Sequence, residues 1–228
     1  MITVLVADDH PLFRAALLTA VRSIDATVSL LESASFDETT ACLREAPEVD
    51  LVLLDLHMPG SHGLMGLAAL RAEFPSVAVM MISAQDDPQI IARALAHGAS
   101  GYVSKSAPLD QLKAALQCVM EGGTYVPSHR LLAVQQARQS NAVEQETARR
   151  LSRLTPQQFK VLGLLAQGRL NKQIADDLGI QERTVKAHVS AIFDRLGVRN
   201  RTQAGVLLSS LDVHDPLKIS QGMESSQG

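Results

Sequence analysis

Val4-Leu5-Val6-Ala7-Asp8-Asp9-His10 opens the chain with a short apolar run that ends in two adjacent acidic residues. The same order returns in Leu51-Val52-Leu53-Leu54-Asp55. Runs of this length are too short for buried helices, and their richness in Val, Ile and Leu is typical of strands. We therefore interpret them as buried strands whose carboxyl ends carry acidic side chains.

Three further runs of the same kind complete the pattern. The five expected strands cover residues 2–7, 28–31, 51–54, 77–82 and 101–103. Between them lie helix-length segments with apolar residues three and four positions apart, such as Leu67, Leu70 and Phe74. Five strands alternating with five helices predict a parallel sheet covered on both faces, because parallel neighbours need crossover connections. Ligands of such sheets bind beyond the carboxyl ends of the strands.

Five polar side chains converge on that edge of the predicted sheet. Asp8 and Asp9 follow the first strand, Asp55 ends the third, Ser83 ends the fourth and Lys105 follows the fifth. Three carboxylates this close repel one another unless a cation lies among them, and Mg2+ favours a few carboxylates with water and phosphate oxygens. Lys105 can pair with an anion attached to Asp55, and Ser83 can donate a hydrogen bond to it. The set predicts phosphoryl transfer to Asp55.

The residues around this set resemble the receivers of bacterial response regulators. The resemblance is carried by Val4-Leu5-Val6-Ala7-Asp8-Asp9-His10, by Leu53-Leu54-Asp55-Leu56-His57-Met58-Pro59-Gly60 and by Gly101-Tyr102-Val103-Ser104-Lys105, and it spans residues 1–123. It implies an α/β flavodoxin-like receiver with strand order 2-1-3-4-5. It also implies that a sensor histidine kinase phosphorylates Asp55.

The same resemblance assigns further roles. Mg2+ is expected on Asp9, Asp55 and the backbone carbonyl of His57, with Asp8 assisting through water. Ser83 and Tyr102 take the switch positions, where the hydroxyl turns toward the phosphoryl group and the aromatic ring rotates inward. Many receivers have Lys-Pro where this chain has Lys105-Ser106, so a cis peptide bond cannot be assumed there.

Three other interpretations of the first domain are weaker. A phosphatase with an aspartyl-phosphate intermediate is disfavoured because Asp55-Leu56-His57 lacks the second aspartate of an Asp-x-Asp motif, so we expect no enzyme beyond the receiver's own phosphoryl transfer and dephosphorylation. A receiver that is never phosphorylated conflicts with the complete set of acidic, hydroxyl and lysine side chains. A metal site built on His10, His57 and His62 lacks ligand spacing.

The second half of the chain predicts helices. Residues 124–151 are polar and read as a partly helical linker. Thr155-Pro156 then supplies an N-cap and a first helical position. A second helix is expected from Asn171, a tight turn at Gly179-Ile180, and a third helix from Glu182. Two short helices joined by a glycine-containing turn indicate a helix-turn-helix, although ordinary helical packing is far commoner for any one such pair.

This region, residues 152–211, resembles the LuxR-type output domain of NarL/FixJ-type response regulators. The resemblance is carried by Asn171-Lys172-Gln173-Ile174-Ala175 and Thr184-Val185-Lys186-Ala187-His188-Val189. It implies a small all-α four-helix domain whose third helix enters the major groove of DNA, with a dimer contact on a fourth helix at about residues 202–211. Within the exposed polar face, which includes His188, it places Lys186, Ala187 and Ser190 toward bases and Lys172 and Thr184 toward phosphates.

Two departures qualify the resemblance. Thr155-Pro156-Gln157-Gln158 replaces a frequent Arg-Glu pair and removes a potential buried ion pair. Ser190 is shorter than many of its counterparts, so base discrimination is expected to be modest. The last residues, 212–228, are rich in Ser, Gln and Gly and are expected to be disordered.

Composition agrees with two domains of opposite charge. The 228 residues are 46% hydrophobic, enough for two cores. Residues 1–126 hold 7 Lys/Arg against 15 Asp/Glu, a net charge of −8, whereas residues 152–211 hold 9 against 4, a net charge of +5. A basic domain suits a phosphate-bearing partner.

No stretch approaches the roughly 18 apolar residues of a membrane helix, so a cytoplasmic protein without membrane contact is expected. Cys42 and Cys118 are expected to be buried core thiols.

Together these patterns predict a DNA-binding response regulator of a two-component system. Phosphorylation of Asp55, with Mg2+ as cofactor, would control homodimerisation and transcription. The expected partners are double-stranded DNA, a sensor histidine kinase, a second copy of the chain in the active state and, as a candidate, RNA polymerase.

Overall fold

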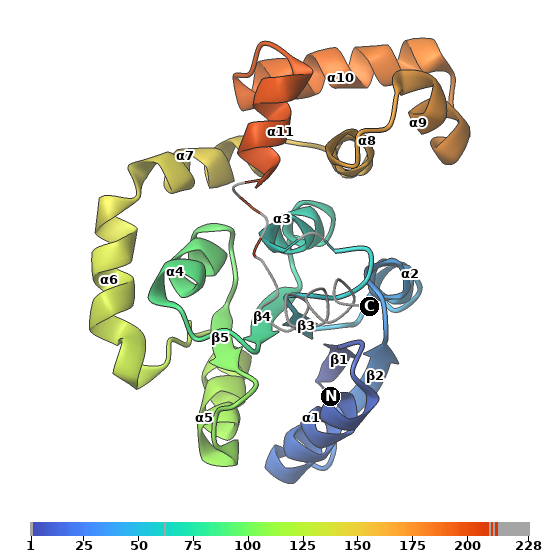
Figure 1. Cartoon of the computed structure of the whole chain (residues 1–228). Helices are drawn as coiled ribbons and strands as arrows, with labels where there is room; N and C mark the ends of the chain where they lie inside the picture. Colours follow the sequence, from blue (N-terminus) through green and yellow to red (C-terminus); the bar gives the residue numbers. More distant parts are fainter. Residues whose placement is uncertain (1, 62, 210, 212, 214–228) are drawn as a thin grey trace, which may run out of the picture.

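The five predicted strands form one parallel sheet in the order β2-β1-β3-β4-β5 (Figure 1). The strands are β1 (Thr3–Ala7), β2 (Ser29–Ser33), β3 (Leu51–Asp55), β4 (Ala78–Ser83) and β5 (Gly101–Ser104). The computed structural model describes residues 2–61, 63–209, 211 and 213. The strand order and the flavodoxin-like fold class predicted from the sequence are confirmed.

Helices cover both faces of the sheet because successive strand residues point to opposite sides. Val4, Leu53 and Ile82 pack with α1 (Pro11–Ile24) and α5 (Leu109–Met120). Leu5, Leu54 and Met81 pack on the other face, where α2 (Phe36–Glu45), α3 (Leu64–Glu73) and α4 (Pro88–Ala96) lie. Both faces are therefore dry, and the polar side chains at the strand ends are left to one edge.

The linker is helical and packs against the receiver. It contains the 3-10 turn η1 (Ser128–Arg130), α6 (Leu131–Ser140) and α7 (Ala142–Leu151). In Figure 1, α6 lies beside α4, and α7 continues toward the C-terminal helices. Val134 and Ala137 of α6 are 1% and 3% exposed and belong to the same core cluster as α4. Burial of these small apolar side chains, rather than linker composition alone, fixes the direction of the linker.

Two groups of charged residues add polar contacts to this packing. Glu144 of α7 lies 2.9 Å from His97 Nε2 and 3.2 Å from Arg93 Nε of α4. Asp86, in the loop between β4 and α4, lies 2.9 Å from His129 Nε2 and 3.1 Å from Arg130 Nε of η1. The linker is thus attached both to α4 and to the loop that precedes α4.

The C-terminal domain has the predicted four helices, α8 (Pro156–Ala166), α9 (Asn171–Leu178), α10 (Glu182–Leu196) and α11 (Arg201–Ser209). Gly179 and Gly197 end α9 and α10 at φ values of +62° and +69°, a left-handed conformation in which a Cβ is unfavourable. Thr155 and Gln158 form a capping box at the start of α8. Most of the expected tail, residues 212–228, lies outside the described residues.

A buried glutamine takes the place of the ion pair that the sequence lacks. Gln158 is 5% exposed, and its Oε1 accepts hydrogen bonds from Thr155 N–H at 2.9 Å and from Arg195 Nη1 at 2.5 Å. Arg195 also donates to the carbonyl of Arg153 at 2.6 Å. The cationic side chain of α10 is therefore held to α8 by neutral acceptors.

The two domains meet through α3 and α8. Met65 and Ala68 of α3 are 7% and 5% exposed and pack in the core cluster of the C-terminal domain with Phe159 and Leu162. The N–H of Leu64 donates to the carbonyl of Leu211 at 3.2 Å. Because α3 contacts the sheet on one side and α8 on the other, it is apolar around most of its circumference.

Two remaining expectations concern the cysteines and the membrane. Cys42 and Cys118 are free thiols as expected, but both are only partly buried, so the prediction of buried core thiols is wrong in the degree of burial. Cys42 packs against the edge of the core cluster that contains Leu43 and Val49. Over the residues that the structure describes, every helix is too short or too polar to cross a bilayer.

Candidate functional site

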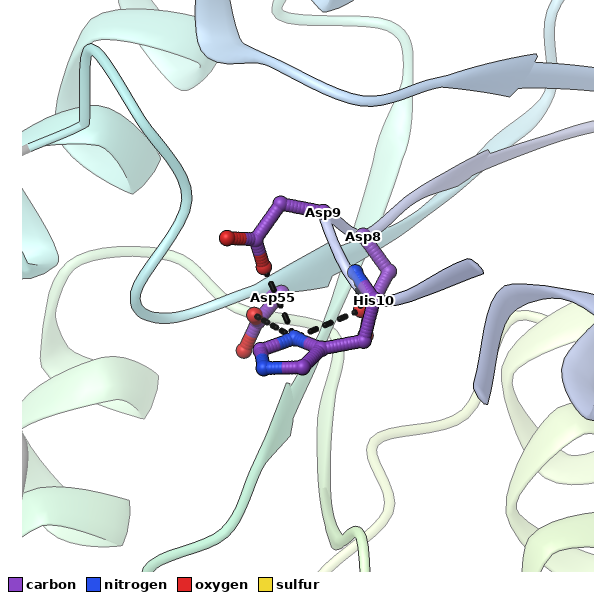
Figure 2. A group of neighbouring side chains, drawn as sticks. All are labelled: Asp8, Asp9, His10 and Asp55. Atoms are coloured by element: carbon purple, nitrogen blue, oxygen red, sulfur yellow. Dashed lines mark hydrogen bonds and ion pairs between the residues drawn. The ribbon is translucent and has the colours of Figure 1, made fainter. Parts of the chain in front are cut away.

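The predicted acidic residues meet at the carboxyl edge of the sheet. Ala7 pairs with Leu54 in the register of β1 and β3, which places Asp8 beside Asp55. Asp8 and Asp55 are 0% and 2% exposed, and Asp9 is partly exposed. Figure 2 shows the three carboxylates facing a common space, with Asp8 and Asp9 from one loop and Asp55 from the end of β3. The sequence prediction of a convergent acidic cluster is therefore met by the geometry.

Lys105 joins this cluster from the neighbouring side. Its Nζ lies 2.8 Å from Asp8 Oδ2 and 3.0 Å from Asp55 Oδ2, and 4.9 Å from the centroid of the Phe13 ring. Burial lowers the pKa of Lys105, but hydrogen bonds and charge from both carboxylates raise it above its ordinary value. The amine is therefore a fixed cation at neutral pH, placed to balance negative charge on Asp55.

Burial has the opposite effect on Asp55. It raises the pKa of the Asp55 carboxyl; Lys105 lowers that pKa, Asp8 raises it, and the backbone N–H of His57 lowers it by hydrogen bonding. The net pKa lies above the ordinary value of an aspartate. Additional positive charge in this space therefore favours the ionised form of Asp55.

The hydroxyl and aromatic residues of the predicted switch lie next to one another. Ser83 at the end of β4 is fully buried, and its Oγ accepts a hydrogen bond from the N–H of Gln85 at 3.1 Å. Tyr102 is 0% exposed, and its hydroxyl donates to the carbonyl of Gln85 at 2.9 Å. Burial holds the pKa of Tyr102 well above its ordinary value. Both switch residues thus contact the same segment of the loop between β4 and α4.

One member of the cluster was missed from the sequence. His10, which we did not expect to take part, places Nδ1 2.8 Å from Asp9 Oδ1 and 3.3 Å from Asp8 Oδ1 (Figure 2). His10 was missed because the usual spacing of metal-binding histidines is several residues from the next ligand. The signal in the sequence was that His10 directly follows Asp8 and Asp9. His57 follows Asp55 as expected and is partly exposed, whereas His62 lies outside the described residues. The Lys105-Ser106 peptide bond is trans.

The second predicted site is the outer face of α10. Val185, Ile192 and Leu196 are fully buried, and Val189 and Phe193 pack beside them, so the opposite face of α10 is turned outward. Thr184, Lys186, Ala187 and Ser190 are exposed, and His188 is partly exposed. Lys186 Nζ lies 2.8 Å from Glu182 Oε1, one turn earlier, and Lys172 near the start of α9 is also exposed. A pair this exposed is weak, so Lys186 is available to another anion.

The position of α10 leaves this face open. In Figure 1, α10 lies on the side of the C-terminal domain that is turned away from the sheet, whereas α8 and α11 lie nearer to the receiver. The apolar contacts between the domains come from α3 and α8. The predicted DNA-contacting residues are therefore accessible in this arrangement of the domains.

Comparison with known proteins assigns a family to each of the two regions. Residues 4–117 match the family model of the response regulator receiver domain, and residues 152–208 match that of the LuxR family of bacterial regulatory proteins. The glycerol metabolism activator of Pseudomonas putida is 39% identical over 215 residues, which cover 93% of this chain and 96% of that protein. The nitrate/nitrite response regulator protein NarL of Escherichia coli K12 is 36% identical over 205 residues, 90% of this chain and 93% of NarL.

A solved structure supports the fold. The response regulator RcsB of Salmonella typhimurium aligns with a TM-score of 0.54 and 23% identity, over 92% of this chain and 98% of RcsB. The chain is thus a DNA-binding transcriptional regulator of the two-component class. It belongs to the NarL/FixJ-type response regulators, with a receiver followed by a LuxR-type helix-turn-helix.

Proposed function

We propose that Asp55 accepts a phosphoryl group from a sensor histidine kinase and that this modification controls how the C-terminal domain binds DNA. The observation that carries the proposal is the buried position of Asp55 between two carboxylates and Lys105. Lys105, whose Nζ lies 3.0 Å from Asp55 Oδ2, can pair with a dianionic phosphoryl group attached to Asp55. Within the chain we take residues 1–123 as the receiver, 124–151 as the linker and 152–211 as the DNA-binding domain.

The transfer itself needs an ionised Asp55. One carboxylate oxygen forms the O–P bond while the P–N bond of the donor phosphohistidine breaks, and the departing imidazole keeps the electron pair and takes a proton. Asp8, Asp9, Asp55 and the backbone carbonyl of His57 would hold Mg2+. The donor set fits this ion, since buried carboxylate oxygens from three residues lie within a few ångströms of one another. Bound Mg2+ supplies charge neutralisation for the phosphoryl oxygens.

Phosphorylation would reach the linker through the loop between β4 and α4. A Ser83 hydroxyl that turns to a phosphoryl oxygen gives up its hydrogen bond with the N–H of Gln85. The carbonyl of Gln85 accepts a hydrogen bond from the hydroxyl of Tyr102. The next residue, Asp86, forms ion pairs with His129 and Arg130 of η1. A shift of this loop therefore changes contacts at the start of the linker, which supports a route from Asp55 to the C-terminal domain.

The output is binding of α10 in the major groove of DNA. Lys186, Ala187 and Ser190 are assigned to base edges, Lys172 and Thr184 to phosphates, and His188 to the border of this face. Exposure of these residues and the net positive charge of the domain support the assignment. We further propose that the phosphorylated chain binds as a homodimer with contacts on α11, so that two copies of α10 lie one turn of DNA apart. RNA polymerase is the partner expected at a promoter.

Labelling with a small phosphodonor tests the acceptor. Wild-type chain incubated with acetyl phosphate and Mg2+ should gain one phosphoryl group by intact-protein mass spectrometry. Asp55→Ala should gain none, whereas Asp110→Ala, on the partly solvated first turn of α5, should label like the wild type. Undiminished labelling of Asp55→Ala would show that another residue accepts the phosphoryl group.

A further inference from the structure

The His10 imidazole lies against all three carboxylates of the acidic cluster. Its Nδ1 lies 2.8 Å from Asp9 Oδ1, 3.3 Å from Asp8 Oδ1 and 4.0 Å from Asp55 Oδ2. One ligand atom from each of these four residues lies within 4.8 Å of all the others. In Figure 2 the imidazole closes the space that the three carboxylates face, with Nδ1 turned inward.

The three distances from His10 Nδ1 are close to those between ligands of a six-coordinate ion. With bonds of about 2.1 Å, neighbouring ligands of an octahedral ion lie about 3.0 Å apart and opposite ligands about 4.2 Å apart. The distances from His10 Nδ1 to Asp9 and Asp8 correspond to neighbouring positions, and the distance to Asp55 corresponds to an opposite position. A tetrahedral ion with the same bonds would require about 3.4 Å for every pair.

The backbone holds His10 in this position independently of any ion. Its N–H donates to Asp8 Oδ1 at 2.8 Å, and it precedes Pro11, the first residue of α1, which restricts it to the extended conformation observed at φ −92° and ψ 104°. The side chain is 59% exposed, so an ion can reach it from solvent. The imidazole is therefore directed at the cluster by local chain geometry at the start of α1.

Lys105 forms ion pairs with Asp8 and Asp55, whereas the His10 imidazole makes its shortest contact with Asp9. Lys105 pairs with Asp8 and Asp55 through their Oδ2 atoms. His10 instead approaches Oδ1 of Asp8 and of Asp9. A protonated imidazole in this position would form an ion pair with Asp9, whereas a neutral imidazole offers a nitrogen lone pair to a cation. Only the second role makes the ratio of Mn2+ to Mg2+ affinity depend on the imidazole, because a charge acts equally on two divalent ions.

We propose that His10 is a fourth protein ligand of the acidic site, and that its nitrogen makes the site prefer an octahedral first-row transition ion, such as Mn2+, over Mg2+. Nitrogen ligands add affinity for first-row transition ions, whereas Mg2+ selects oxygen ligands and retains water. This inference rests on the metal site of the proposed function and adds to it the class of ion. It implies that Mn2+ occupies the receiver at concentrations well below those needed for Mg2+.

The experiment is a metal titration of the full chain. Mn2+ binding is followed by the loss of the free-ion electron paramagnetic resonance signal, and Mg2+ binding by its competition with Mn2+. His10→Ala should lower the ratio of Mn2+ to Mg2+ affinity by about tenfold or more. Pulsed resonance of bound Mn2+ should show nitrogen coupling in the wild type and none in His10→Ala. His129→Ala, which removes a partly exposed imidazole from η1, is the matched control and should leave the ratio unchanged.

The outcomes distinguish a failure of the metal site from a failure of the role of His10 in it. If His10→Ala changes both affinities by the same factor, the imidazole acts only through its charge and the inference fails. Asp9→Asn tests the site itself and should weaken both ions. If Asp9→Asn binds Mn2+ like the wild type, the proposed metal site is wrong and the role of His10 falls with it. Loss of binding in Asp9→Asn with an unchanged ratio in His10→Ala overturns the inference alone.

Discussion

Replacing Lys105 with alanine should destabilise the receiver strongly when no divalent ion is present. The side chain is 16% exposed and is the shared partner of Asp8 and Asp55, which are 0% and 2% exposed. Removing one member of a buried ion pair costs about 3–5 kcal/mol because the remaining charge stays buried. Because the Lys105 side chain is itself 16% exposed, a loss at the lower end of this range, about 3 kcal/mol, is expected.

Tyrosine fluorescence measures this loss in the intact chain. The sequence has no tryptophan, and its two tyrosines, Tyr102 and Tyr125, both lie in β5 or next to it, so the signal reports unfolding of the receiver. With a slope of about 1.5 kcal/mol per M urea, the midpoint of Lys105→Ala should fall by about 2 M. Lys113→Ala, on the same domain but in a partly exposed position of α5, is the control and should stay near the wild type.

Mg2+ provides the second half of this test. The ion should raise the urea midpoint of Lys105→Ala more than that of the wild type, because the variant has lost the cation that otherwise balances Asp8 and Asp55. A midpoint within about 0.5 M of the wild type in the absence of divalent ions would refute the electrostatic account of this cluster. Equal responses of the two proteins to Mg2+ would refute it as well.

Three further changes test other parts of the structure. The pKa of Glu144 is lowered because its contacts with His97 and Arg93 outweigh burial, so its contribution to linker docking is present above its ordinary pKa of 4.5 and is lost as pH falls below it. A label-to-label distance between α4 and α7 should therefore lengthen on acidification, and Glu144→Gln should show the longer distance already at pH 7. Lys186→Ala should weaken specific DNA binding by about 1–3 kcal/mol in a fluorescence-anisotropy titration, whereas Lys160→Ala on α8 should not; equal effects would take α10 out of the major groove. Gly197→Ala should destabilise the C-terminal domain by about 1–2 kcal/mol in thermal melts followed by circular dichroism, because φ is +69° there; an unchanged melt would mean that the end of α10 adapts freely.

The sheet and its acidic edge were predictable because they depend on short-range patterns. Apolar runs of three to six residues define the strands, and each strand places the residue that follows it at a known edge. Asp8, Asp55 and Lys105 converge for this reason alone. The helix-turn-helix was predictable in the same way, since Gly179 and the apolar spacing of α10 fix the turn and the buried face.

Contacts between distant segments were not predictable from such patterns. Glu144 meets His97 across 47 positions in the sequence, and the polar linker composition does not reveal that α6 buries Val134 against the receiver. The contact of α3 with both the sheet and α8 is reflected in the sequence, because residues 64–70 are almost continuously apolar. The same run is equally consistent with a helix that buries only one face. The orientation of His10 depends on the backbone at the start of α1, which sequence spacing does not encode.

The most direct test of the central claim is the DNA affinity of the full chain with and without phosphorylation. A duplex enriched from a random pool by the wild-type protein is titrated at fixed salt, with and without acetyl phosphate and Mg2+. The account predicts that the phosphodonor changes the affinity of the wild type by about tenfold and leaves that of Asp55→Ala unchanged. The same change in both proteins, or none in a wild type shown to be phosphorylated, would contradict it.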